Sequence, residues 1–311
     1  MRFHATFYDT ALIVLIGLPA SGKSHYAKEM IRDNPMRAQW ISSDNIRIEY
    51  DYNISNEKVF QKMWERTKAA ALGKKYIIYD ATNISAKKRE LLVKQFKHFC
   101  EKNQLMHTAE AVVFLQPIEV LLERNSKREG RECVPEKVIY RMLRQFQFPI
   151  YSEGFSLIRI NEYSQGEKIN LGMIADMDQK NPHHTYTLGG HLLEAENQAE
   201  VNGHSKAVRI AALYHDVGKY WTQEIDEKGV AHYYNHENVG AYKVALHFLE
   251  NNLLNNNDKT KVYYDAIILI NYHMRPFVWK KSEKAEEKDR KKLGTFFKEI
   301  EALNQCDRAA H

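Results

Sequence analysis

Cysteine, proline and long hydrophobic runs are scarce in this sequence. Seven prolines and 14 glycines in 311 residues exclude a collagen-like or low-complexity chain. The three cysteines, Cys100, Cys133 and Cys306, form no CxxC pair, so no disulfide framework is expected and a reducing cytoplasm is the expected compartment. No apolar run approaches the ~18–20 residues of a membrane helix, so no membrane partner is expected. The early run 11–18 has eight residues and no basic segment before it, which argues against a signal peptide.

Charge and histidine are unevenly distributed along the chain. Residues 1–165 hold 26 Lys and Arg against 19 Asp and Glu, whereas residues 166–311 hold 19 against 21. Ten of the 14 histidines lie in the second part. A basic first part suits a polyanionic partner, although surplus charge also serves solubility. A histidine-rich second part suits a metal site.

The pattern of hydrophobic residues predicts two domains of different class, 1–165 and 166–311, with the boundary near 161–175. In the first domain, short apolar strands alternate with helices at 57–72 and 85–101, which predicts an α/β fold with a parallel sheet and flanking helices. These strands are expected at 11–16, 76–79, 111–115 and 156–160. The second domain is expected to be all-α, with helices at 184–199, 206–214, 239–251, 262–272 and 294–310. The mixed-charge run 281–292 suggests a solvated helix end or a mobile loop.

A phosphate-binding loop follows the first predicted strand. The segment Gly17-Leu-Pro-Ala-Ser21-Gly22-Lys23-Ser24 fits GxxxxGK[ST] at every fixed position and opens a predicted helix. Glycines allow backbone N–H groups to surround phosphate oxygens, and the helix N-terminus adds positive potential. In such loops the lysine neutralises the β- and γ-phosphates and the serine ligates Mg²⁺. The expected ligands are therefore ATP and Mg²⁺.

An acidic and a basic residue lie three positions apart after the next apolar stretch. At helical spacing Asp44 and Arg47 face one site, where Asp44 could act as general base and Arg47 could hold an acceptor phosphate. The alternative is a helix N-cap aspartate with a surface arginine.

Two further segments carry candidate phosphate-site residues. Asp80 ends an apolar strand and is followed by Asn83, and a carboxylate there commonly serves the Mg²⁺ water shell. The run 124–131 offers Arg124, Arg128 and Arg131 as cations of a mobile lid that closes over phosphates. A solvated basic turn is the alternative.

Taken together, residues 12–150 resemble the kinase domain of the phage-type 5′-hydroxyl polynucleotide kinases. The resemblance implies that Asp44 is the general base toward the 5′-OH and that Arg47 binds the acceptor's 3′ phosphate. It further implies that Lys23 and Arg128 stabilise the transferring phosphoryl group, with Arg131 as a second candidate for the lid arginine. Asp80 and Asn83 are assigned supporting roles at the substrate site. The phosphatase motif DxDxT of the best-known member is not expected here, because Asp176 and Asp178 lack the hydroxyl residue that follows.

The second part offers a nitrogen–oxygen cage for one or two divalent metals. Four histidines and two aspartates on different predicted helices have the donor types that first-row metals accept: His191, His215, Asp216, His236, His273 and Asp307. Asp216 is suited to bridge two metals, because a carboxylate has two oxygens. The remaining histidines are expected to be structural or exposed.

This set resembles the HD phosphohydrolase family, and adding His236 and His273 resembles its two-metal branch. The lead-in 181–191 and the run His215-Asp216-x-Gly-Lys219 are similar to HD domains attached to some tRNA nucleotidyltransferases. The resemblance implies an all-helical phosphomonoesterase or cyclic phosphodiesterase that uses Mn²⁺, Co²⁺, Ni²⁺, Fe²⁺ or Zn²⁺. Lys219 is either a contact to substrate phosphate or a surface lysine.

Combined, the two resemblances indicate an enzyme that heals nucleic-acid ends, with RNA as the expected substrate. One domain would add a 5′ phosphate and the other would remove a 2′,3′-cyclic, 2′ or 3′ phosphate, which prepares ends for an RNA ligase. Two alternatives remain open: a small-molecule or nucleoside kinase fused to an HD nucleotidase, and a non-catalytic nucleotide sensor on an HD scaffold. The second alternative needs neither Asp44 nor a complete metal-ligand set.

Overall fold

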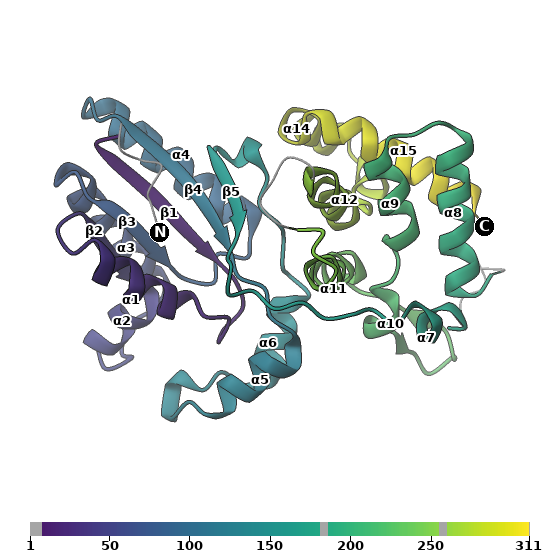
Figure 1. Cartoon of the computed structure of the whole chain (residues 1–311), viewed down its shortest axis with the longest axis horizontal. Helices are drawn as coiled ribbons and strands as arrows, with labels where there is room; N and C mark the ends of the chain where they lie inside the picture. The colour runs from purple at the N-terminus through teal and green to yellow at the C-terminus, as the bar shows by residue number, and fades with distance from the viewer. Residues whose placement is uncertain (1–7, 181–185, 255–259, 311) are drawn as a thin grey trace. The chain divides into compact units, whose positions relative to one another are not determined.

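The computed structural model describes residues 8–180, 186–254 and 260–310. They form two compact units (Figure 1). The first comprises Met1–Phe114, Glu119–Val134 and Pro149–Ser164, and the second comprises Gln165–His311 together with Leu115–Ile118 and Pro135–Phe148. The two short segments of the second unit lie inside the range that the sequence assigns to the first domain. Local hydrophobic patterning shows that a segment is buried, but not in which core it is buried.

The first unit is built on five parallel strands in the order β2-β3-β1-β4-β5. Their bounds are β1 Thr10–Ile16, β2 Ala38–Ser42, β3 Tyr76–Asp80, β4 His107–Val113 and β5 Leu157–Ile160. The predicted parallel sheet with flanking helices is therefore confirmed. Strand β2 was not predicted, because its apolar stretch is too short to stand out. Strand β4 begins earlier than expected, because the buried polar residues Thr108 and Glu110 interrupt its apolar pattern.

Helices cover this sheet (Figure 1). They are α1 Lys23–Asp33, α2 Ser43–Glu49, α3 Asn56–Leu72, α4 Ala86–Lys102 and most of α5 Ile118–Ser126, with the 3₁₀ turns η1 Gly130–Glu132 and η2 Tyr151–Glu153. Residue pairing aligns Leu15 of β1 and Ser42 of β2 with Asp80 of β3. The carboxyl ends of these three neighbouring strands therefore meet at one edge of the sheet, where parallel α/β folds bind their ligands.

The second unit is helical, as predicted. It contains α6 Glu136–Leu143, α7 Leu171–Ala175, α8 Leu188–Val201, α9 Lys206–Tyr214, α10 Lys219–Thr222, α11 His236–Glu250, α12 Lys261–Tyr272, α13 Arg275–Trp279, α14 Glu283–Leu293 and α15 Thr295–Ala309. A small hairpin of β6 Glu224–Ile225 and β7 Ala231–His232 was not predicted, since each strand has two residues. The mixed-charge run is a helix, α14, with an acidic first turn and a basic last turn that suit the helix dipole.

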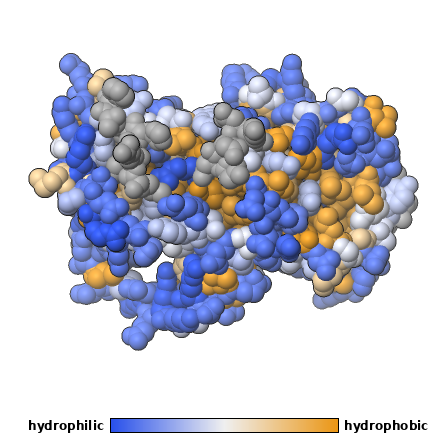
Figure 2. Space-filling model, in the orientation of Figure 1, coloured by the Kyte–Doolittle hydropathy of each residue, from blue (hydrophilic) through white to orange (hydrophobic). Residues whose placement is uncertain are grey.

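The two units differ in surface character on the face drawn in Figure 2. Hydrophilic residues dominate the first unit there, and hydrophobic residues gather over helices of the second. Among the described residues, no helix combines the length and the hydrophobicity needed to span a bilayer.

Candidate active sites

The phosphate-binding loop connects β1 to α1 and depends on Gly17 for its shape. A Cβ atom at Gly17 would lie 2.6 Å from Ser21 Oγ and 3.0 Å from Phe114, so a larger residue would have to displace the Ser21 hydroxyl and would crowd Phe114. Gly22 has φ of 100°, a left-handed conformation that glycine adopts without strain. The backbone N–H of Gly17 donates to the carbonyl of Thr82 at 3.0 Å, which ties the loop to the turn after β3.

Lys23 lies buried at the start of α1, inside this loop. Its Nζ donates to the carbonyl oxygens of Gly17 at 3.0 Å and Leu18 at 2.8 Å, and to Ser21 Oγ at 3.3 Å. Phosphate oxygens would compete with these neutral acceptors for the ammonium group. Charge-assisted hydrogen bonds are roughly twice as strong as neutral ones, so an anion would have the advantage.

The charged residues that affect the pKa of Lys23 are residues that the sequence predicts for the phosphate site. Burial lowers the pKa of Lys23 to about 8, while Asp80 and Asp44 oppose that shift and Arg128 adds to it. Asp80, Asp44 and Arg128 are therefore all within electrostatic reach of the lysine. The structure thus brings together the loop, the strand-end carboxylate, the proposed base and one lid arginine.

Asp80 is arranged to take part in a cation site with Ser24. Its Oδ2 accepts hydrogen bonds from Ser24 Oγ at 2.9 Å and from the indole Nε1 of Trp40 at 3.1 Å. Burial raises the pKa of Asp80, and Lys23, Ser24 and Trp40 work against that rise. Serine and carboxylate oxygens at this position are the protein ligands that Mg²⁺ accepts in phosphate-binding loops. Trp40 was not predicted to lie at this site.

Asp44 lies in the first turn of α2 and is not its N-cap. Ser42 caps the helix, since its Oγ accepts from the backbone N–H groups of Asp44 at 3.2 Å and Asn45 at 3.3 Å. The side chain of Asp44 is 71% exposed, and its Oδ1 accepts from Arg47 Nη1 at 3.0 Å. Arg47 also donates to Asn56 Oδ1 at 3.0 Å. The N-cap alternative is therefore wrong, and the carboxylate is open to an acceptor hydroxyl.

The three candidate lid arginines have different surroundings. Arg128 lies within electrostatic reach of Lys23. The guanidinium of Arg131 lies over the ring of Tyr52, 5.5 Å from its centroid. Arg124 lies in the last turn of α5. Of the three, Arg128 is the one whose charge contributes to the lowered pKa of Lys23.

Asn83 holds the turn that follows β3. It has φ of 49°, and its Nδ2 donates to the carbonyl of Leu15 at 2.7 Å. Arg89 Nη1 donates to the carbonyl of Asn83 at 2.8 Å, and Arg89 itself forms a fully buried ion pair with Glu153 at 2.7 Å. Asn83 thus stabilises the edge that carries Asp80. No local pattern in the sequence indicates Arg89 or Glu153, because their pairing joins positions far apart in the chain.

The second site is lined by four buried histidines that share one arrangement. In each, Nδ1 lies beside a backbone carbonyl oxygen: His191 with Ala310 at 3.2 Å, His215 with Ala212, His236 with Tyr233 and His273 with Ile270 at 2.8 Å each. A carbonyl only accepts, so each Nδ1 carries a hydrogen. In the neutral ring, Nε2 then presents a lone pair. This carbonyl contact is the usual outer support of a metal-binding histidine.

The four Nε2 atoms converge in two pairs. His191 and His215 bring theirs to 3.2 Å, and His236 and His273 bring theirs to 3.1 Å. Two nitrogens that both present lone pairs cannot hydrogen-bond to each other, so a shared cation suits each pair. Asp307 joins the first pair, with Oδ1 at 3.2 Å from His191 and 3.3 Å from His215. The residues present therefore fit divalent metals.

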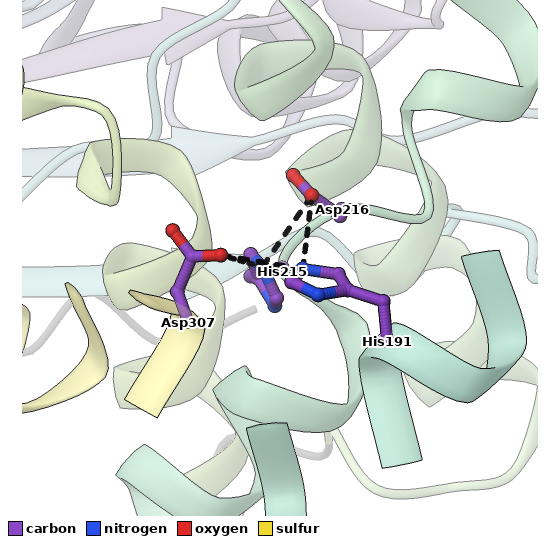
Figure 3. Close-up of side chains that lie close together, drawn as sticks. All are labelled: His191, His215, Asp216 and Asp307. Carbon is purple, nitrogen blue, oxygen red and sulfur yellow. Dashed lines mark hydrogen bonds and ion pairs between the residues drawn. The ribbon is translucent and has the colours of Figure 1, made fainter. Parts of the chain in front are cut away.

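Asp216 divides its two oxygens between the pairs. Its Oδ2 lies 3.4 Å from His191 and 3.5 Å from His215, and its Oδ1 lies 3.0 Å from His236 and 3.4 Å from His273. Figure 3 shows His191, His215, Asp216 and Asp307 pointing toward one another. The described residues thus form two potential metal-binding groups that share Asp216, as a bridging carboxylate would.

The ionised carboxylates of Asp216 and Asp307 contribute negative charge to this centre. Burial favours their neutral forms, but Lys219 and the histidines hold the pKa of Asp216 well below its usual range. The neighbouring His191 and His215 likewise lower the pKa of Asp307, against the effect of its burial. Burial would lower the pKa of His191, but Asp216 and Asp307 outweigh it and raise that pKa to about 9. Such a centre attracts positive charge.

Lys219 lies inside this centre. Its Nζ is 2.6 Å from Asp216 Oδ2 and donates to Gln179 Oε1 at 2.9 Å. The surface-lysine alternative is therefore wrong, because the side chain is buried. Gly218, just before it, allows a close approach of α10 to α11, because a Cβ there would lie 2.0 Å from the carbonyl oxygen of His236. Gln179 was not predicted to lie at this site.

Two family models match separate parts of the chain. A family model described as an AAA domain matches residues 12–149, and one described as an HD domain matches residues 183–304. A solved gluconokinase from Sinorhizobium meliloti 1021 is 14% identical, over 48% of this chain and 82% of that chain, with a TM-score of 0.32. That likeness is too slight to indicate a function. The chain therefore carries a P-loop kinase-like domain and an HD domain.

Proposed function

We propose that this chain heals RNA ends, by ATP-dependent phosphorylation of a 5′-hydroxyl and by metal-dependent removal of a 2′,3′-cyclic, 2′ or 3′ phosphate. The observation that carries the proposal is the Asp44–Arg47 pair beside the phosphate-binding loop. A loop that only senses nucleotide needs no exposed carboxylate held by an arginine. In a polynucleotide kinase, that pair receives the acceptor hydroxyl and the neighbouring phosphate.

In the kinase reaction, Asp44 accepts the proton of the 5′-hydroxyl as its oxygen attacks the γ-phosphorus and ADP leaves. Lys23 and Arg128 offset the charge on the transferring group. Arg47 binds the acceptor phosphate while Asn56 holds the guanidinium in place. Ser24 and Asp80 would supply protein oxygens for Mg²⁺, which would offset negative charge on the phosphates.

In the second reaction, the histidine Nε2 atoms and the two aspartates would hold divalent metal, and Asp216 belongs to both groups. When bound, the metal polarises a phosphoryl oxygen and lowers the pKa of water. Lys219 neutralises part of the charge on Asp216 and lies where it can contact substrate phosphate. The backbone carbonyls of Ala310, Ala212, Tyr233 and Ile270 keep the rings oriented.

One oligoribonucleotide that carries a substrate group at each end tests both proposed reactions. We would incubate an oligoribonucleotide bearing a 5′-hydroxyl and a 2′,3′-cyclic phosphate with ATP–Mg²⁺ and, separately, with Mn²⁺, Co²⁺ or Ni²⁺, and determine product masses. The expected result is one phosphate gained at the 5′ end and one lost at the 3′ end. Lys23→Ala should abolish only the gain, and Asp216→Ala should abolish only the loss.

Other outcomes point to the alternatives. Unchanged oligonucleotide ends with phosphorylated nucleosides would favour the small-molecule kinase. Nucleotide binding without turnover of either end would favour the sensor. An oligodeoxyribonucleotide tested in parallel decides between RNA and DNA, and an RNA ligase added afterwards tests whether the healed ends can be sealed.

A further inference from the structure

The segment that carries the lid arginines belongs to both units. Its middle, Glu119–Val134, packs with the first unit, whereas its two ends, Leu115–Ile118 and Pro135–Phe148, pack with the second. Arg128 lies in the middle part, and its charge contributes to the lowered pKa of Lys23. The residues that hold the two ends are therefore residues of the second unit.

The start of the segment is held by Tyr242 of α11. The backbone N–H of Gln116 donates to Tyr242 Oη at 3.2 Å, and the same hydroxyl donates to the carbonyl of Gln116 at 3.0 Å. Tyr242 is completely buried, and burial raises the pKa of its hydroxyl. One phenol thus satisfies both backbone groups of the residue that leads into α5.

The end of the segment is held by two asparagines and by the same tyrosine. Asn238 Nδ2 donates to the carbonyl of Arg144 at 2.9 Å, and Asn271 Oδ1 accepts from the backbone N–H of Phe148 at 2.9 Å. Asn271 Nδ2 also donates a hydrogen bond to Asn238 Oδ1 at 2.8 Å. The ring of Phe146 packs edge-on against Tyr242, with centroids 5.1 Å apart. Tyr242 therefore contacts both ends of the segment.

These anchors lie next to the second catalytic centre. Asn238 is two residues after His236 at the start of α11, and Asn271 is two residues before His273 at the end of α12. Helix α11 begins at the potential metal ligand His236 and α12 ends just before the potential ligand His273, and both helices carry side chains that hold the lid segment. The four side chains that make these contacts are all buried: Tyr242, Asn238, Asn271 and Phe146.

We propose that Tyr242, Asn238 and Asn271 are positioning residues for the kinase lid, so that phosphate binding in the first domain depends on α11 and α12 of the second. They touch neither nucleotide nor metal and act by fixing the two ends of the segment that carries Arg128. This inference rests on the proposed role of the lid in binding ATP.

Tyr242→Phe is the sharpest single change, because it removes the hydroxyl and keeps the ring against Phe146. Loss of a buried hydrogen bond of this kind is expected to weaken Mg·ATP binding about 5- to 30-fold, measured by titration calorimetry. Mg·ATP binding needs no acceptor, so a failed end-healing assay would leave this measurement intact. Tyr263→Phe, a tyrosine of α12 whose ring packs on Phe248, is the matched control and should bind as wild type does.

A double-mutant cycle with Arg128→Ala separates positioning from general damage. If Tyr242 acts through the lid arginine, Tyr242→Phe should have little further effect once Arg128 is gone. Metal content of the second site should stay unchanged in both variants. Equal losses in the presence and absence of Arg128, or unaltered Mg·ATP affinity in Tyr242→Phe, would overturn the inference. Phe146→Leu is a second variant, because it loosens the packing of the end of the segment on Tyr242. It too should weaken Mg·ATP binding, and it should have little further effect once Arg128 is replaced by alanine.

Discussion

At the residue scale, Lys23 shows how burial affects a group whose hydrogen bonds go to neutral acceptors. Its ammonium donates to two carbonyl oxygens and a hydroxyl, and burial lowers its pKa from 10.5 to about 8. Below pH 8 the lysine is charged in both the folded and the unfolded chain, and the desolvation cost is fully present. Between about 8 and 10.5 the unfolded chain binds more protons, so the free energy of unfolding must rise with pH.

We therefore expect nucleotide-free wild-type protein to gain stability relative to Lys23→Met as pH rises from 8 to 10.5. The gain has an upper bound of roughly 3 kcal/mol. Thermal midpoints measured for both proteins at half-unit pH intervals test this. If the thermal midpoints of the two proteins changed in parallel with pH, the pKa of Lys23 would not be lowered by folding, and the prediction would fail.

Asp216 is the residue on which both metal-binding groups depend. His273 belongs to one group only, whereas Asp216 belongs to both. We expect wild type to hold about two divalent ions per chain, His273→Ala about one and Asp216→Ala close to none. Elemental analysis after gel filtration measures this directly, with His247→Ala as the control because His247 lies in neither group. Equal metal content in wild type and His273→Ala would contradict the two-group arrangement.

At the element scale, the buried Arg89–Glu153 pair joins α4 to η2 and supports the turn that carries Asn83. Removing one partner leaves a buried charge without compensation, so Arg89→Met should destabilise the first unit by about 3–5 kcal/mol. Adding Glu153→Leu should restore much of that loss. Arg66→Ala, which breaks the exposed pair with Glu49, should cost less than about 1 kcal/mol. Denaturant titrations of the four proteins provide the comparison, and a loss in Arg89→Met as small as in Arg66→Ala would count against it.

Much of this arrangement could be predicted from the sequence because its signals are local. The phosphate-binding loop, the apolar strand β1 and the spacing of Asp44 and Arg47 each lie within one short segment. Trp40, Arg89, Gln179 and Tyr242 could not be predicted, because each acts on a partner distant in the chain. The helix α14 was missed as a regular element because its mean hydropathy is low and its support comes from charges near its ends. The packing of Pro135–Phe148 with the second unit has no local signal in the sequence either, because the apolar residues of a segment do not reveal their partners.

At the scale of the whole molecule, two candidate catalytic centres of different chemistry are joined in one chain with opposite charge balance. Residues 1–165 carry a formal net charge of +7, whereas residues 166–311 carry a formal net charge of −2. A strand bound by its phosphates should therefore be held chiefly by the first part. Each phosphate neutralised on a single strand contributes a slope of about −0.7 to the dependence of log affinity on log salt.

We expect the Michaelis constant for the acceptor in the kinase reaction to rise steeply with salt for an RNA of about 12 nucleotides and weakly for a nucleoside 3′-monophosphate. The difference in slope reports the number of backbone phosphates contacted beyond the first. Steady-state assays between about 50 and 300 mM KCl measure it, while hydrolysis of a small phosphodiester at the second site should change little over the same range. Equal slopes for the long and the short acceptor would show that the basic surface does not follow the strand, and would shift the kinase toward small-molecule acceptors even if Asp44 and Arg47 act as proposed.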